Sequence, residues 1–245
     1  MSDGFRITRL SGVTARFVDY EWPFARRNAA AIAAHWRGRV ARSPGMFDGT
    51  VLLGCASAIV DGIARVDLFA TRYSSFIAYR DGRHADGCVV NAFAAIVPRS
   101  ADGAVLLGEM GAHTANAGQL YFPCGTPDPD DVRGASVDLA GSAARELLEE
   151  TGLALPEDAE AGWVLIEGEG QLAFLRPVLF PEPAAALDAR IEAHRRREAE
   201  PELAGIHIVR DVGGLDASRM PGFVRAYLAH AFAPAALPPG TARAP

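Results

Sequence analysis

The sequence predicts an α/β fold in which a small N-terminal α/β section packs beside a larger α/β domain. Short apolar runs bounded by Gly, Pro and Asp alternate along the chain with amphipathic stretches of helical period. At 245 residues the chain is long enough for a core of about 150 residues and a smaller companion. We therefore expect an N-terminal extension at 1–86, a main domain at 87–233 and a loose, Pro/Ala-rich tail at 234–245.

In the N-terminal section, alternation and apolar runs predict three strands, at 13–18, 51–60 and 63–69. Asp61-Gly62 between the last two is a hairpin signal. Trp22-Pro23 opens a predicted helix at 24–40. This section carries no catalytic motif, and we expect it to form part of a substrate pocket or a homodimer interface.

In the main domain, apolar runs predict strands at 88–97, 104–107, 163–166, 171–179 and 206–209. A loop at 113–119 enters a further short strand that ends at Pro123. An amphipathic helix is expected at 184–199, and a last helix at 220–232 has Pro221 just inside its start, a favoured position.

Composition and charge exclude several functions. The net charge of −6 argues against sequence-independent binding to nucleic acid. Every basic side chain among the 24 Lys+Arg residues is arginine, which excludes lysine Schiff-base chemistry and a P-loop lysine. The three cysteines have no CxxC spacing, which disfavours a zinc cluster or a disulfide framework. Without an apolar signal region or a run long enough to span a bilayer, we expect a cytoplasmic protein with no membrane partner.

The stretch Arg145-Glu146-Leu147-Leu148-Glu149-Glu150-Thr151-Gly152-Leu153 predicts the end of a helix, with Gly152 as a left-handed C-cap. At about 100° per residue, three carboxylates share one face: Glu146, Glu149 and Glu150. Three apolar residues fall opposite and are expected to face a core: Ala144, Leu147 and Leu148. Crowded carboxylates repel one another unless a cation lies between them, and oxygen ligands suit Mg²⁺ or Mn²⁺. The alternative is an ordinary solvated helix face.

This stretch resembles the Nudix hydrolase box, whose core reads Arg-Glu-aliphatic-any-Glu-Glu-any-Gly-aliphatic. Phe122-Pro123-Cys124-Gly125 resembles the Pro-Gly-Gly turn before that box, with Cys124 in place of the first glycine. The resemblance implies a Nudix-type α/β/α sandwich with a mixed sheet. It also implies a metal-dependent hydrolase that cleaves the phosphoric anhydride of a nucleoside diphosphate linked to another moiety, X, and releases nucleoside monophosphate and phospho-X.

By matching positions, the resemblance implies that Glu146, Glu149 and Glu150 bind Mg²⁺ or Mn²⁺. It places Gly125 in the same metal site, where its backbone can turn close to a bound phosphate. Glu149 or Glu150 is the first candidate for the general base and Glu202 the next; taken alone, Glu202 is more typical of an exposed loop acid. Arg145 is expected to orient Glu149 through a charge-assisted pair.

The chain departs from the family pattern before Arg145, where a segment is inserted after Gly125. Val137 occupies the position of the usual upstream glutamate. Its neighbour Asp138 is expected to cap a helix that starts at Leu139, and the alternative is that Asp138 replaces the missing acid.

Two features bear on the substrate. Ala117-Gly118-Gln119 is similar to a run in the coenzyme A pyrophosphatase branch, so coenzyme A is one candidate beside nucleotide sugars and dinucleotides. The basic run at 194–197 is either a solvated helix face or a phosphate-facing patch. Two other functions stay open: a Nudix-fold binding or regulatory module without hydrolysis, and a structural protein. The three retained box glutamates favour the enzyme.

Overall fold

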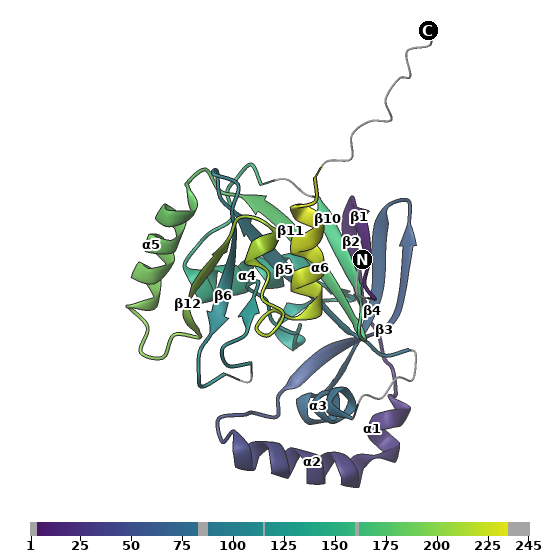
Figure 1. The fold of residues 1–245 in the computed structure, drawn as a ribbon. Helices are drawn as coiled ribbons and strands as arrows, with labels where there is room; N and C mark the ends of the chain where they lie inside the picture. Colours follow the sequence, from purple (N-terminus) through teal and green to yellow (C-terminus); the bar gives the residue numbers. More distant parts are fainter. Residues whose placement is uncertain (1–3, 83–87, 115, 160–161, 235–245) are drawn as a thin grey trace.

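The computed structural model describes residues 4–82, 88–114, 116–159 and 162–234, which form two sheets and their flanking helices (Figure 1). The larger sheet has the order β1-β10-β11-β5-β6-β12, with β7 paired to β6. Its seven strands are β1 (Arg6–Leu10), β5 (Asn91–Arg99), β6 (Val105–Met110), β7 (Leu120–Tyr121), β10 (Trp163–Gly168), β11 (Gln171–Leu179) and β12 (Leu203–Val209). Strands β5 and β11 run parallel and the other pairs antiparallel, so the predicted mixed sheet is confirmed.

The smaller sheet has the order β3-β4-β2-β9-β8. Its strands are β2 (Gly12–Phe17), β3 (Thr50–Val60), β4 (Ile63–Arg72), β8 (Val132–Arg133) and β9 (Ser136–Val137). The predicted hairpin between β3 and β4 is confirmed, because Asp61 and Gly62 form its turn with φ angles of 50° and 77°. Strands β8 and β9 come from the inserted segment after Gly125, which therefore extends this sheet beyond β2.

Six α-helices lie outside the sheets: α1 (Pro23–Arg27), α2 (Ala29–Arg42), α3 (Tyr73–Asp81), α4 (Leu139–Thr151), α5 (Ala184–Arg195) and α6 (Gly222–Ala231). Short 3₁₀ turns occupy Pro129–Asp131 and Val212–Gly214. The single helix predicted at 24–40 is wrong, because Asn28 leaves helical geometry at φ −111° and separates α1 from α2. The Asn28 side chain donates to the Phe24 carbonyl and so helps to end α1.

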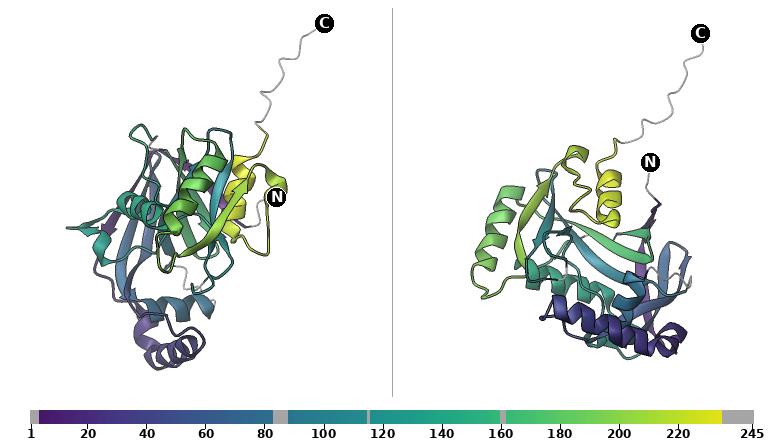
Figure 2. Two further views of the ribbon diagram at one scale, coloured as in Figure 1. Left: turned by 90° about the vertical axis from the view of Figure 1, so that its left-hand side faces the viewer. Right: turned by 60° about the horizontal axis from the view of Figure 1, so that its bottom comes forward.

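The alternating side chains of β5 show how the layers are built. Ala92, Ala94 and Ile96 face a core that α4, α5 and the smaller sheet complete. Phe93, Ala95 and Val97 face a second core, which α6 covers (Figure 1). Helices on both faces of the larger sheet make the α/β/α arrangement that the sequence predicted. Helices α1 to α3 gather at the opposite end of the molecule from α6, over a third apolar cluster (Figure 2).

The strands do not follow the predicted division at residue 86. Strand β1 belongs to the larger sheet, and β8 and β9 belong to the smaller one. The boundary at residues 86 and 87 and the tail at 235–245 lie outside the described residues, so the division into an extension, a main domain and a tail stays a prediction. Within the described ranges, no helix combines the length and apolar character that crossing a bilayer requires.

The two sheets meet at Gly54 of β3, whose backbone exchanges two hydrogen bonds of 2.9 Å with Val90. A Cβ atom at Gly54 would lie 3.0 Å from Val90 Cγ2 and 3.3 Å from Ala92 Cβ. Gly54→Val should therefore lower the free energy of unfolding by about 1–3 kcal/mol, because it overpacks this junction. Urea denaturation measures the change.

Gly12→Val on β2 is the matched control, because a Cβ atom there would meet only Ile63 at an ordinary 3.8 Å. This variant should keep the wild-type stability. Equal stability of the Gly54 and Gly12 variants would contradict the close approach of the sheets.

Candidate active site

Helix α4 has both of the predicted caps. Asp138 Oδ1 accepts a hydrogen bond of 2.8 Å from the Gly141 backbone N–H, and Gly152 ends the helix at φ 69°. The Gly152 N–H donates to the Leu148 carbonyl. Asp138 therefore acts as a helix cap, and its predicted alternative as an accessory acid stays without support from its contacts.

The buried face of α4 is rotated from the one that the sequence predicted. Leu147 is fully buried, as expected, but Leu148 is 49% exposed and its predicted core position is wrong. Glu150 is instead only 7% exposed. The Glu150 carboxylate therefore faces the protein interior, and a buried acid requires a partner or a function.

An acidic hollow of 450 Å³ lies beside the C-terminal half of α4. Its lining residues are Glu146, Glu149, Glu150, Glu198, Ala199, Glu200 and Glu202. The structure therefore brings together the three box glutamates, which come from one helix, and the later acid Glu202 next to β12. The carboxylates differ in depth, since the Glu146 side chain is 21% exposed and that of Glu149 is 62% exposed.

Burial strongly disfavours negative charge in this hollow. Desolvation raises the pKa of Glu150 well above its ordinary value, and the charges of Glu202 and Glu146 raise it further. Desolvation also raises the pKa of Glu146 to about 7, against the opposing effect of Arg145. A divalent cation among these oxygens would offset both the desolvation and the repulsion, so the donor set fits Mg²⁺ or Mn²⁺.

The carboxylates are close but do not already surround one point. Among the residues that the structure describes, no three His, Cys, Asp or Glu side chains are arranged to hold an ion. Glu149 and Glu146 have flexible side chains that can turn towards Glu150. Binding of an ion would therefore draw the carboxylates together.

The turn before the box contacts two of the carboxylates that line this hollow. The Cys124 N–H donates to Glu150 Oε1 at 3.2 Å. A Cβ atom at Gly125 would lie 2.6 Å from Glu146 Oε1, so a larger residue here would displace the Glu146 carboxylate. Gly125 is thus beside the predicted metal ligands, while its own place in a metal site stays a prediction.

Arg145 has a closer partner than the one that the sequence predicted. Its Nε atom lies 3.9 Å from Glu149 Oε1, whereas its Nη1 donates to Asp131 Oδ1 at 2.7 Å. Nη2 lies 3.6 Å from Glu146 Oε1. Arg145 thus links the inserted segment to the carboxylates at the end of α4.

Asp131 is the residue that sequence reasoning missed, because it appeared to be one acid of an ordinary turn. It is 1% exposed, and besides Arg145 it accepts from Ser142 Oγ at 2.9 Å and from the Asp128 N–H at 3.2 Å. Val137, which occupies the usual glutamate position, is instead a buried residue of β9. Asp131 is therefore a buried acid of the inserted segment that contacts Arg145.

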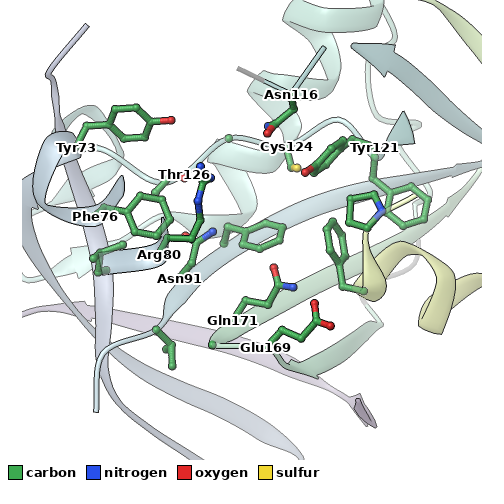
Figure 3. A pocket seen from close by; sticks show the side chains of 18 of the residues that line it. Tyr73, Phe76, Arg80, Asn91, Asn116, Tyr121, Cys124, Thr126, Glu169 and Gln171 are labelled. Atoms are coloured by element: carbon green, nitrogen blue, oxygen red, sulfur yellow. The ribbon is translucent and has the colours of Figure 1, made fainter. Parts of the chain in front are cut away.

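A second cavity, which we call the chamber, has a volume of 1020 Å³. Figure 3 shows side chains that line it. Glu150 and Glu202 line both cavities. Helix α3 of the N-terminal section contributes Tyr73, Phe76 and other residues to the chamber wall. The arrangement places an acidic, cation-compatible end next to a large aromatic recess.

The basic run at 194–197, which begins in the last turn of α5, mostly makes contacts within the chain. His194 Nε2 lies 2.9 Å from the Glu149 carbonyl oxygen, Arg195 Nε donates to the Leu203 carbonyl at 2.8 Å, and Arg196 Nε donates to Glu192. These contacts support a structural function for the run, in which α5 holds α4 and β12 around the acidic hollow.

No family model matches the sequence, and no curated protein matches it. Several solved structures are similar to part of the chain, including the following three. The MutT protein from Methanosarcina mazei is 21% identical, with a TM-score of 0.35 over 57% of this chain and 91% of its own. A Nudix hydrolase from M. smegmatis is 18% identical, with a TM-score of 0.33 over 56% and 79%. A mutant pyrophosphohydrolase from Bacillus subtilis is 15% identical, with a TM-score of 0.30 over 54% and 72%. Because every TM-score lies below 0.5, the function proposed below rests on this chain's residues.

The contacts of Asp131 give a stability prediction. Asp131→Ala should lower the free energy of unfolding by about 1–3 kcal/mol, because it leaves Arg145 and Ser142 without their buried acceptor. Chemical denaturation followed by circular dichroism measures the loss. Asp130→Ala removes a neighbouring exposed carboxylate and should leave the stability unchanged. If both variants unfold alike, the link between Asp131 and Arg145 does not stabilise the fold.

Proposed function

We propose that this chain is a metal-dependent hydrolase that cleaves the phosphoric anhydride of a nucleoside diphosphate linked to a moiety X. The products are nucleoside monophosphate and phospho-X. The observation that carries the proposal is the acidic hollow, in which Glu146 and Glu150 are largely shielded from solvent and lie next to Glu202. Burying such acids is unfavourable without a counter-charge, and the resemblance of residues 145–153 to the Nudix box points to the same chemistry.

Within this proposal, Glu146 and Glu150 are the main ligands of Mg²⁺ or Mn²⁺, and Glu149 joins them from the rim. When bound, the cation neutralises charge on the diphosphate oxygens and lowers the pKa of a bound water. Oxygen ligands and a site open to solvent on one side suit either ion.

The protein groups then have separate tasks. Arg145, fixed by Asp131, keeps a positive charge beside Glu146 and Glu149 and limits their repulsion. Glu149 and Glu202 reach the same hollow from opposite sides, on α4 and next to β12, and either can accept the proton of the attacking water. The Cys124 N–H holds one oxygen of Glu150 and so leaves the other free to bind the ion.

Removing the buried carboxylate should abolish turnover. We expect Glu150→Gln to lower Mg²⁺-dependent hydrolysis by about two orders of magnitude or more without unfolding the protein. Glu149→Gln should also lower it strongly. The measurement is release of monophosphate in a screen of dinucleotides, nucleotide sugars and coenzyme A with Mg²⁺ or Mn²⁺.

The matched control is Glu157→Gln, an exposed acid away from the acidic hollow, which should behave as wild type. If no compound in the screen is hydrolysed while the protein still binds one of them, a binding or regulatory module replaces the enzyme as the proposed function.

Metal binding is tested without any substrate. Mg²⁺ or Mn²⁺ should raise the melting temperature of the wild type, because a ligand that binds only the folded state stabilises it by about 2.7 kcal/mol at one hundred times its Kd. The doubly substituted Glu146→Gln, Glu150→Gln protein should lose this increase. If millimolar Mg²⁺ and millimolar Mn²⁺ both leave the wild-type melting temperature unchanged, the proposed metal site is wrong.

A further inference from the structure

We infer that the chamber binds the nucleobase of the substrate, and that the amide side chains of Asn91 and Gln171 hydrogen-bond to the edge of its ring. The inference rests on the proposed function and extends it, because it says which half of the substrate enters the protein and which residues select it.

Asn91 and Gln171 are placed together by the sheet. Each is the first residue of its strand, on β5 and β11, and they are partners in the parallel register. Both line the chamber, and Figure 3 shows the two amides side by side in its wall. Two neighbouring amides present donors and acceptors in the pattern that the edge of a nucleobase offers in return.

The side chain of Asn91 has an unsatisfied hydrogen-bond acceptor. Its Oδ1 atom is buried and accepts no hydrogen bond within the described part of the chain. A buried acceptor without a donor destabilises the fold, so its presence in a cavity wall needs an explanation. A ligand N–H that reaches Asn91 provides one.

The rest of the chamber offers flat apolar surface. Phe76 of α3, Tyr121 of β7 and the edge-to-face pair Phe93 and Phe223, whose ring centroids are 5.4 Å apart, all contribute to the lining. Every nucleobase has a π face that can stack on such rings. The aliphatic arm of coenzyme A or a hydroxyl-rich sugar would leave this aromatic surface poorly used.

The charges in the chamber favour a neutral group over a second phosphate. Arg80 is the one cationic side chain among the described lining residues, and it lies 3.4 Å from Asp81 and 5.8 Å from the Phe76 ring centroid. Glu169 also lines the chamber beside Gln171 (Figure 3). The anhydride belongs at the boundary formed by Glu150 and Glu202, and the uncharged base belongs inside.

The test uses the full chain in EDTA, so it needs neither metal nor turnover. The probes are AMP, GMP, CMP, UMP, ribose 5-phosphate and 4′-phosphopantetheine, followed by saturation-transfer NMR and by titration. We expect at least one nucleoside monophosphate to bind roughly tenfold or more tightly than ribose 5-phosphate, with its base protons receiving the strongest saturation.

Asn91→Leu and Gln171→Leu should each weaken that binding roughly tenfold or more, because a hydrogen-bonding edge of the base is left unpaired. Asn91→Leu should melt at the same temperature as wild type or higher, since it removes the unpartnered oxygen. Glu157→Gln is the control, because the Glu157 side chain is exposed and lies outside the chamber. It should bind as wild type does.

Three results would overturn the inference: equal affinity for ribose 5-phosphate and every monophosphate, tighter binding of 4′-phosphopantetheine, or wild-type affinity in both leucine variants. Because binding is measured without metal, a failed hydrolysis assay does not affect it. If one of these three results is found while metal-dependent hydrolysis persists, this subsite is removed and the proposed function stands.

Discussion

The burial of Glu150 is the constraint on which the rest of the site depends. A carboxylate that is 7% exposed and faces two other acids is unfavourable unless nearby groups hold it and a cation can join it. The chain meets the first condition with the Cys124 N–H and with a glycine at 125 that lets the turn approach Glu146. Capping at both ends sets where α4 begins and ends, and packing of Leu147 in the core sets the face that points inward.

The Asp131–Arg145 contact explains how the inserted segment serves this site. Asp131 is the last residue of a 3₁₀ turn and precedes β8 and β9, which extend the smaller sheet from β2. Its contact with Arg145 therefore joins the smaller sheet to the acidic end of α4. The inserted segment therefore supplies both a buried acid, Asp131, and the two strands β8 and β9 at one edge of the smaller sheet.

Local signals predicted much of the fold, including both caps of α4, the Asp61-Gly62 hairpin and the positions of most strands along the chain. The misses have physical causes. Strand β1 reads Arg-Ile-Thr-Arg-Leu, and Leu10 is its one buried residue. The strand therefore lacks the apolar run by which the other strands were predicted. Helix α3 begins Tyr-Ser-Ser-Phe, a weak helix former, and Phe76 and Ile77 are buried with the third apolar cluster, which tertiary packing decides. The burial of Asp131 could not be predicted, because its partner Arg145 lies 14 residues further along the chain. The exposure of Leu148 could not be predicted either, because Glu150 is buried beside Leu147 in its place.

The two cavities divide the work of the proposed enzyme. The acidic hollow takes its residues from α4 and the segment before β12, while the chamber also uses α3 and the starts of β5 and β11. Glu150 and Glu202 line both cavities, so a ligand that fills the chamber would lie next to a proposed cation ligand, Glu150, and a proposed proton acceptor, Glu202. Side chains deep in the chamber, such as Asn91, can therefore change which substrate is accepted while the carboxylates and their chemistry stay the same. A chain that departs from the box upstream of Arg145 can then keep its reaction and acquire its own specificity.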